Sequence, residues 1–137
     1  MRTKSLTVFK DGDTEICVMY QQSDGCPSGH GKELAEFLEP FVLVNGIRLD
    51  ETRKIANGMS CLVAQVIAHF KNKSGVGGIY IYPAGTRDCG EDYIYLVYGK
   101  EGENPMIECF KSSETEPLFK SSAASMLKRL EAEEETG

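Results

Sequence analysis

The chain begins with two stretches in which apolar and polar residues alternate, the pattern of strands that bury one face. Residues 5–10 read Ser-Leu-Thr-Val-Phe-Lys, and residues 15–22 are rich in Ile, Val, Met and Tyr. Between them, Asp11-Gly12-Asp13-Thr14 is suited to a turn, because Asp and Gly tolerate the positive φ values of tight turns. The pattern therefore predicts a β-hairpin at the start of the chain.

Residues 23–31 hold three glycines and a proline, so we expect a loop there, and helical spacing begins after it. Apolar residues at intervals of three and four predict a helix over 32–41 that stops near Pro40. A turn is expected at Asn45-Gly46, and a short helix over 49–57. The longest apolar stripe predicts the core helix over 59–73, which consecutive glycines end; it consists of Met59, Leu62, Val63, Val66, Ile67 and Phe70.

Three more strands are predicted at 79–83, 93–98 and 106–110, and a last helix within 118–134. The connections between these strands are short, which favours antiparallel pairing. The order of elements predicts an α+β protein with a single domain over residues 1–130. We expect a largely antiparallel five-stranded sheet with helices packed on one face, followed by an acidic C-terminal tail over 131–137.

Both faces of the predicted sheet are apolar or aromatic. Tyr80 and Tyr82 alternate with isoleucines, and the strand over 93–98 alternates in the same way. If the helices cover one face, the second must meet another subunit, the C-terminal segment or a ligand. Aromatic residues are enriched at interfaces, so we expect a homo-oligomer; folding of the last helix over this face is the alternative.

Composition and charge narrow the classes of partner. The 137 residues include 15 Lys plus Arg and 21 Asp plus Glu, a net charge of -6, and the last seven residues carry -4 of it. An acidic balance argues against binding to duplex nucleic acid. The longest apolar runs fall far short of the ~20 residues that span a bilayer, so we expect no membrane contact and a cytoplasmic location.

The cysteines indicate a reducing compartment. They are five, an odd number, without the paired spacing of zinc ligands or of a disulfide framework, so we expect no metal site. No cofactor fingerprint is present either. Cys26 and Cys89 fall in predicted loops, where either can be a nucleophile, although no base is fixed beside it.

The loop before the first helix is the most informative stretch. It reads Asp24-Gly25-Cys26-Pro27-Ser28-Gly29-His30-Gly31-Lys32, and its glycines allow the backbone to approach a ligand closely. A phosphate or carboxylate can sit at the free amides of a helix start, with Lys32 and His30 as donors. The spacing does not match a Walker A loop or a dinucleotide fingerprint. The alternative is a glycine-rich turn in which Asp24 caps an amide and His30 packs at the helix start.

A second polar loop, over 84–92, supplies Arg87, whose planar fork suits the same anions. If the strand ends bring this loop beside the first, the two form one compact site. The expected ligand-binding residues are Asp24, Gly25, Ser28, Gly29, His30, Gly31, Lys32, Thr86, Arg87 and Asp88.

With these motifs in view, the chain resembles an uncharacterised family of small bacterial and phage proteins. The resemblance rests on Ser5-Leu6-Thr7-Val8, on the stretch from Asp24 to Leu34, and on Ile79-Tyr80-Ile81-Tyr82-Pro83-Ala84-Gly85-Thr86-Arg87-Asp88. It implies no catalytic residues. A phage setting implies an accessory protein that acts in the host cytoplasm to evade host defence, by neutralising a host signal or enzyme.

Three hypotheses follow. The first is a protein that binds, without turnover, a small anionic and nucleotide-derived ligand. The second is an inhibitor that binds a host protein directly through the aromatic face. The third is a small hydrolase with His30 as general base, oriented by Asp24 or Asp88, and with loop amides that stabilise an oxyanion.

Overall fold

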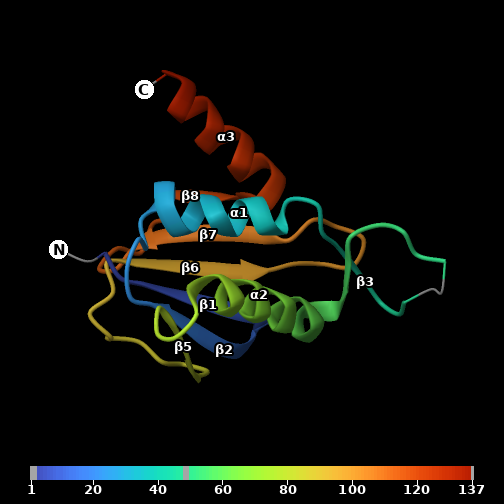
Figure 1. Ribbon diagram of the computed structural model, residues 1–137, viewed down its shortest axis with the longest axis horizontal. Coiled ribbons are helices and arrows are strands. Elements are labelled where there is room, and N and C mark those ends of the chain that lie inside the picture. Colours follow the sequence, from blue (N-terminus) through green and yellow to red (C-terminus); the bar gives the residue numbers. More distant parts are fainter. Residues whose placement is uncertain (1–2, 48–49, 137) are drawn as a thin grey trace.

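A computed structural model describes residues 3–47 and 50–136 of the chain. In this part of the chain, six strands form one twisted sheet (Figure 1). They are β1 (Ser5–Asp11), β2 (Thr14–Gln21), β5 (Ile79–Pro83), β6 (Tyr93–Tyr98), β7 (Met106–Lys111) and β8 (Phe119–Ser122). The spatial order is β5-β2-β1-β6-β7-β8. Every neighbouring pair is antiparallel except β1 and β6, which are parallel, so the sheet is mixed and has one strand more than predicted.

The helices confirm the α+β class. A π-helical turn, η1 (Pro27–Gly31), leads directly into α1 (Lys32–Leu38), and the core helix α2 (Gly58–Ser74) matches the predicted apolar stripe. The last helix is α3 (Ala123–Thr136). The acidic residues after position 130 are therefore helical as far as Thr136, and this end of α3 points away from the sheet (Figure 1).

The short helix expected over 49–57 was wrong. Leu49 lies outside the described residues, and β4 (Ile55–Asn57) is a strand that pairs in parallel with β3 (Val42–Val44). Ala56 and Leu43 are buried opposite one another in this pair. Pairing with a segment about a dozen residues away thus outweighs the weak local preference for a helix.

The antiparallel pairing expected between β5 and β6 was also wrong. β5 lies against β2, and β6 lies against β1, so two strands separate them and residues 84–92 cross from one to the other. A sequence reveals the length of a connection but not which partner each strand finds. Here β1 offers both of its edges, one to its hairpin partner β2 and one to β6.

Two apolar clusters occupy the two faces of the sheet. The larger joins buried residues of α1, α2 and α3 to Phe9, Met19 and Tyr95 on the facing strands. The smaller consists of Leu6, Val8 and Val18 on the opposite face, and Cys89 of the crossing segment 84–92 packs against it. The last helix therefore lies on the same face as the others, and the crossing segment covers part of the second face.

None of the helices in the described residues is both long and apolar enough to cross a membrane.

Candidate functional site

The loop from Ser23 to Gly31 passes over one end of β1. The Gly25 N–H donates to the Thr3 carbonyl at 3.0 Å, which ties the loop to the start of that strand. Pro27 begins η1, where its fixed φ is favourable and its missing N–H costs nothing. The second half of the expected loop is therefore a helical turn that carries His30 into the interior.

The loop glycines are required by packing. A Cβ at Gly25 would lie 2.8 Å from the Ser5 Cβ, and one at Gly29 would lie 2.5 Å from the Asp24 carbonyl oxygen. At Gly31 the nearest atom would be the Tyr95 hydroxyl, at 3.1 Å. Gly25 and Gly31 allow the turn to lie directly on the sheet, and Gly29 allows it to fold closely against Asp24, so the close neighbours of all three are the protein's own atoms.

His30 is fully buried. Its Nε2 lies 3.0 Å from the Thr7 Oγ1, and its ring contacts those of Phe70 and Tyr95, with centroids 5.0 and 5.3 Å away. Loss of solvation, together with the charge of Lys73, lowers the pKa of His30 to about 4, so the ring is neutral near pH 7. Its Nδ1 has no hydrogen-bond partner among the described residues. Of the two alternatives for His30, the geometry is that of a packed residue at the helix start.

Tyr95 completes the buried polar layer beneath the loop. Its hydroxyl donates to the Gly25 carbonyl at 2.8 Å, and its burial raises its pKa far above the usual range. Two side chains of the sheet thus hold the loop from below, Thr7 through the His30 ring and Tyr95 through the Gly25 carbonyl. The loop is positioned by its buried half, which leaves its outer half to face solvent.

The structure does not bring Arg87 to this loop. The Arg87 Nη2 lies 2.6 Å from the Glu15 Oε1, and the Gly85 N–H donates to the other Glu15 oxygen, also at 2.6 Å. The hydrogen bond from Arg87 is the main reason that the pKa of Glu15 is lowered. Glu15 is at the start of β2 and the loop follows its end at Gln21, a separation of about 20 Å at ~3.3 Å per residue.

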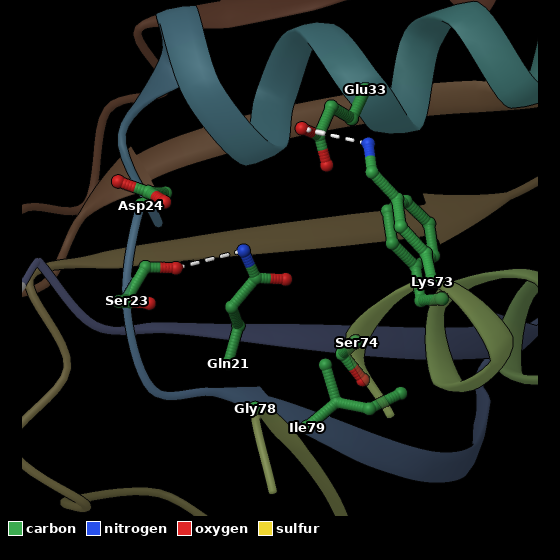
Figure 2. Close-up of a pocket in the computed structure, with 9 residues that line it drawn as sticks. Gln21, Ser23, Asp24, Glu33, Lys73, Ser74, Gly78 and Ile79 are labelled. Atoms are coloured by element: carbon green, nitrogen blue, oxygen red, sulfur yellow. Dashed lines mark hydrogen bonds and ion pairs between the residues drawn. The ribbon is translucent and has the colours of Figure 1, made fainter. Parts of the chain in front are cut away.

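A cleft of about 210 Å³ opens beside the loop instead (Figure 2). It lies between the end of β2, the start of α1 and the end of α2. Asp24 and Ser23 lie on one side, and Lys73 and Ser74 lie on the other. The lining residues are Gln21, Ser23, Asp24, Glu33, Phe70, Lys73, Ser74, Gly78 and Ile79.

Most polar groups of the cleft already have partners. The Lys73 Nζ lies 3.0 Å from the Glu33 Oε1, and the Gln21 Nε2 donates to the Ser23 carbonyl at 2.8 Å. The Asp24 carboxylate has no hydrogen-bond or ion-pair partner among the residues that the structure describes. With two carboxylates and one ammonium group, the cleft carries a formal charge of about -1, next to the negative end of α2.

Of the expected ligand-binding residues, Asp24 alone lines this cleft in the described structure. Ser28 is exposed and Lys32 is half-buried outside it, while Gly25, His30 and Gly31 are buried and Gly29 is half-buried. Thr86, Arg87 and exposed Asp88 belong to the crossing segment, where the Thr86 hydroxyl donates to the Pro83 carbonyl at 2.7 Å.

Sequence reasoning missed the cleft residues contributed by α2. Lys73 and Ser74 occupy the last turn of a helix that the apolar stripe predicts only as a core element. Glu33 lies in the first turn of α1 and is not among the expected ligand-binding residues. No local motif links these positions to Asp24, because the fold alone brings them together.

Among the described residues, no group of three or more His, Cys, Asp or Glu side chains is arranged to hold a metal ion. Comparison of the chain with protein-family models, with curated proteins and with solved structures gives no significant match. The resemblance to small phage and bacterial proteins thus stays a prediction.

Proposed function

We propose that the protein binds a small polar ligand in the cleft beside Asp24 and releases it unchanged. The observation that carries the proposal is the unpaired Asp24 carboxylate at the rim of a cleft of about 210 Å³. A lone carboxylate in a partly enclosed site favours a ligand that presents an ammonium or hydroxyl group to it. The Gln21 Nε2 donates to Ser23 and the Ser74 hydroxyl donates to the Gly77 carbonyl at 3.4 Å, so these side chains offer the ligand their acceptor oxygens from the same walls.

The buried position of His30 supports binding over hydrolysis. A general base must come within hydrogen-bond reach of the proton that it removes. His30 is 0% exposed, its one side-chain hydrogen bond in the described structure is to Thr7, and no described hydrogen bond joins its ring to the carboxylate of Asp24 or Asp88. The hydrolase hypothesis therefore has no geometric support at His30.

An anionic, nucleotide-derived ligand is the second candidate, and Lys73 is the observation that favours it. The ammonium group of Lys73 lines the cleft, where it can meet a phosphate. Such a ligand must displace Glu33, which holds Lys73 at 3.0 Å, and it must also tolerate Asp24. Ribose hydroxyls that donate hydrogen bonds to the Asp24 carboxylate would offset its repulsion of the phosphate.

Calorimetric titration distinguishes these ligand classes. One panel contains amines, amino sugars and polyamines; the other contains nucleotides and cyclic nucleotides. Each compound is recovered after long incubation with stoichiometric protein and weighed by mass spectrometry. We expect saturable binding from the first panel and recovery of the ligand intact, whereas a chemically altered ligand would contradict binding without turnover.

Asp24→Asn is the decisive variant. Asp24 has φ +57°, and asparagine tolerates this left-handed conformation, so the change removes the charge without straining the loop. The control is Asp88→Asn, because Asp88 is the other non-glycine residue of the described structure with positive φ, at +60°, and lies outside the cleft. Loss of affinity of about 10-fold or more in Asp24→Asn alone supports the proposal. Equal affinity of both variants and the wild type would exclude the cleft as the site.

A further inference from the structure

The strand β5 is the most exposed apolar segment in the described structure. It forms an outer edge of the sheet and reads Ile-Tyr-Ile-Tyr-Pro, without a charged side chain (Figure 1). Tyr80 is 44% exposed, Ile81 45% and Tyr82 37%, and nearby Val76 is fully exposed. The edge strands of β-sheets are normally protected by charges, bulges or covering segments, so an unprotected apolar edge strand indicates a surface that pairs with another strand.

The backbone of Ile81 faces the open side of this edge. The Gln22 N–H donates to the Gly78 carbonyl, which makes these two residues a hydrogen-bonded pair of the β2–β5 ladder. Such pairs alternate along an antiparallel ladder, so Tyr80 and Tyr82 bond to β2. The N–H and C=O groups of Ile79, Ile81 and Pro83 consequently point away from it.

The outward backbone groups of Ile79 and Pro83, on either side of Ile81, already have hydrogen-bond partners. The Ile79 N–H donates to the Gly77 carbonyl at 2.9 Å, and the Ile79 carbonyl accepts from the Lys71 Nζ at 3.3 Å. Pro83 has no N–H, and its carbonyl accepts from Thr86. Along this edge, the described structure leaves one donor and one acceptor open, and both belong to Ile81.

We propose that β5 is the dimer interface of the protein, and that two copies pair edge to edge about a two-fold axis at Ile81. The Ile81 N–H of each copy donates to the Ile81 carbonyl of the other, which satisfies both open groups with one reciprocal pair. An isologous contact requires a surface that complements itself. One donor and one acceptor on the same residue meet that requirement.

The side chains of β5 fit the same symmetry. Antiparallel pairing centred on Ile81 places Tyr80 opposite Tyr82 of the second copy, and this pair is of the non-hydrogen-bonded kind, in which side chains lie closest. Tyr20 lies on the same face, 6.2 Å from the Tyr80 ring and 6.0 Å from that of Tyr82. The two copies therefore join two tyrosine clusters into one. The contact is short, which places the dimer in the class of small, micromolar interfaces.

Sedimentation equilibrium of the full chain tests the interface. The wild type is compared with Ile81→Lys, which places a charge at the centre of the pair, and with Ile81→Pro, which removes the outward N–H. The matched control is Leu118→Lys, because Leu118 is also exposed, at 37%, and lies outside β5. Circular dichroism verifies that each variant is folded.

We expect a wild-type dimer with a Kd below about 100 μM, weakening of at least about 10-fold in both Ile81 variants, and a dimer of wild-type affinity in Leu118→Lys. Ile81→Cys adds a test of the register, because Cα atoms about 5.5 Å apart allow a disulfide. Oxidation should link two copies of this variant and leave the wild type and Leu118→Cys unlinked. A monomeric wild type, a dimer indifferent to both Ile81 variants, or an Ile81→Cys protein that does not cross-link would each overturn the proposal.

Discussion

The burial of His30 predicts that the protein loses stability in mild acid. The pKa of His30 is about 4 in the folded chain, against an ordinary value of 6.5, chiefly because the ring is removed from water. Between these two values the unfolded chain binds a proton that the folded chain does not. The contribution of the neutral ring is therefore complete above about pH 6.5 and is lost as the pH falls toward about 4.

The size of the loss follows from the pKa difference. At about 1.4 kcal/mol per pKa unit, the interval from 6.5 to about 4 corresponds to about 3 kcal/mol of unfolding free energy. A loss of this size is a large share of the 5–15 kcal/mol typical of a small domain. His30→Gln should reduce the pH dependence by this amount, because glutamine stays neutral and can still bond to Thr7. The variant is less stable than the wild type near pH 7, because glutamine does not replace the packing of the imidazole ring against Phe70 and Tyr95.

Urea unfolding at a series of pH values from about 7 to about 4 measures the difference. The control is His69→Gln, which removes a histidine from an exposed position on α2. We expect the unfolding free energies of the wild type and of His69→Gln to fall in parallel as the pH is lowered. The unfolding free energy of His30→Gln should fall by about 3 kcal/mol less over the same interval. If all three curves run in parallel, His30 is not buried as a neutral ring and the reasoning fails.

Three further predictions concern other contacts. Gly29→Ala should lower the unfolding free energy by about 1–3 kcal/mol in urea titration, because the added Cβ would lie 2.5 Å from the Asp24 carbonyl oxygen, whereas exposed Ser28→Ala should not. Glu15→Ala should cost at most about 1 kcal/mol, but it should speed hydrogen exchange across residues 84–92 by releasing Arg87 and Gly85. Burial raises the pKa of Cys109 to about 12, so this thiol should resist a thiol reagent until denaturant is added, as counted by mass spectrometry.

Local pattern was sufficient for the elements whose own side chains decide their structure. The hairpin of β1 and β2 and the helix α2 lie where alternation and helical spacing predicted them. The strands that the pattern missed are β3, β4 and β8, which are only three or four residues long and acquire their conformation from a neighbour. The parallel pairing of β1 with β6 joins segments about 90 residues apart, and no local signal specifies it.

The candidate site was predicted in part for the same reason. The sequence singled out the segment from Asp24 to Lys32, which does border a cleft, but it could not distinguish glycines that approach a ligand from glycines that approach the sheet. It also placed Arg87 beside this segment, although Glu15 holds Arg87 near the other end of β2. A polar residue in a loop reveals its chemistry locally, whereas its partner depends on the whole fold.

The two halves of the loop therefore have separable tasks. Gly25 and His30 pack against the sheet and Gly29 packs against the Asp24 carbonyl, so these residues determine where the loop lies, while Asp24 lines the cleft that the loop helps to form. Because the Asp24 carbonyl accepts the His30 N–H at 2.7 Å, the buried half also fixes the backbone that carries the carboxylate. Under the proposed function, a change at Asp24 weakens the ligand without unfolding the chain, whereas a change at His30 first weakens the chain and reaches the ligand only through Asp24. Under the same proposal, most of the segment from Asp24 to Lys32 serves to hold one carboxylate in place.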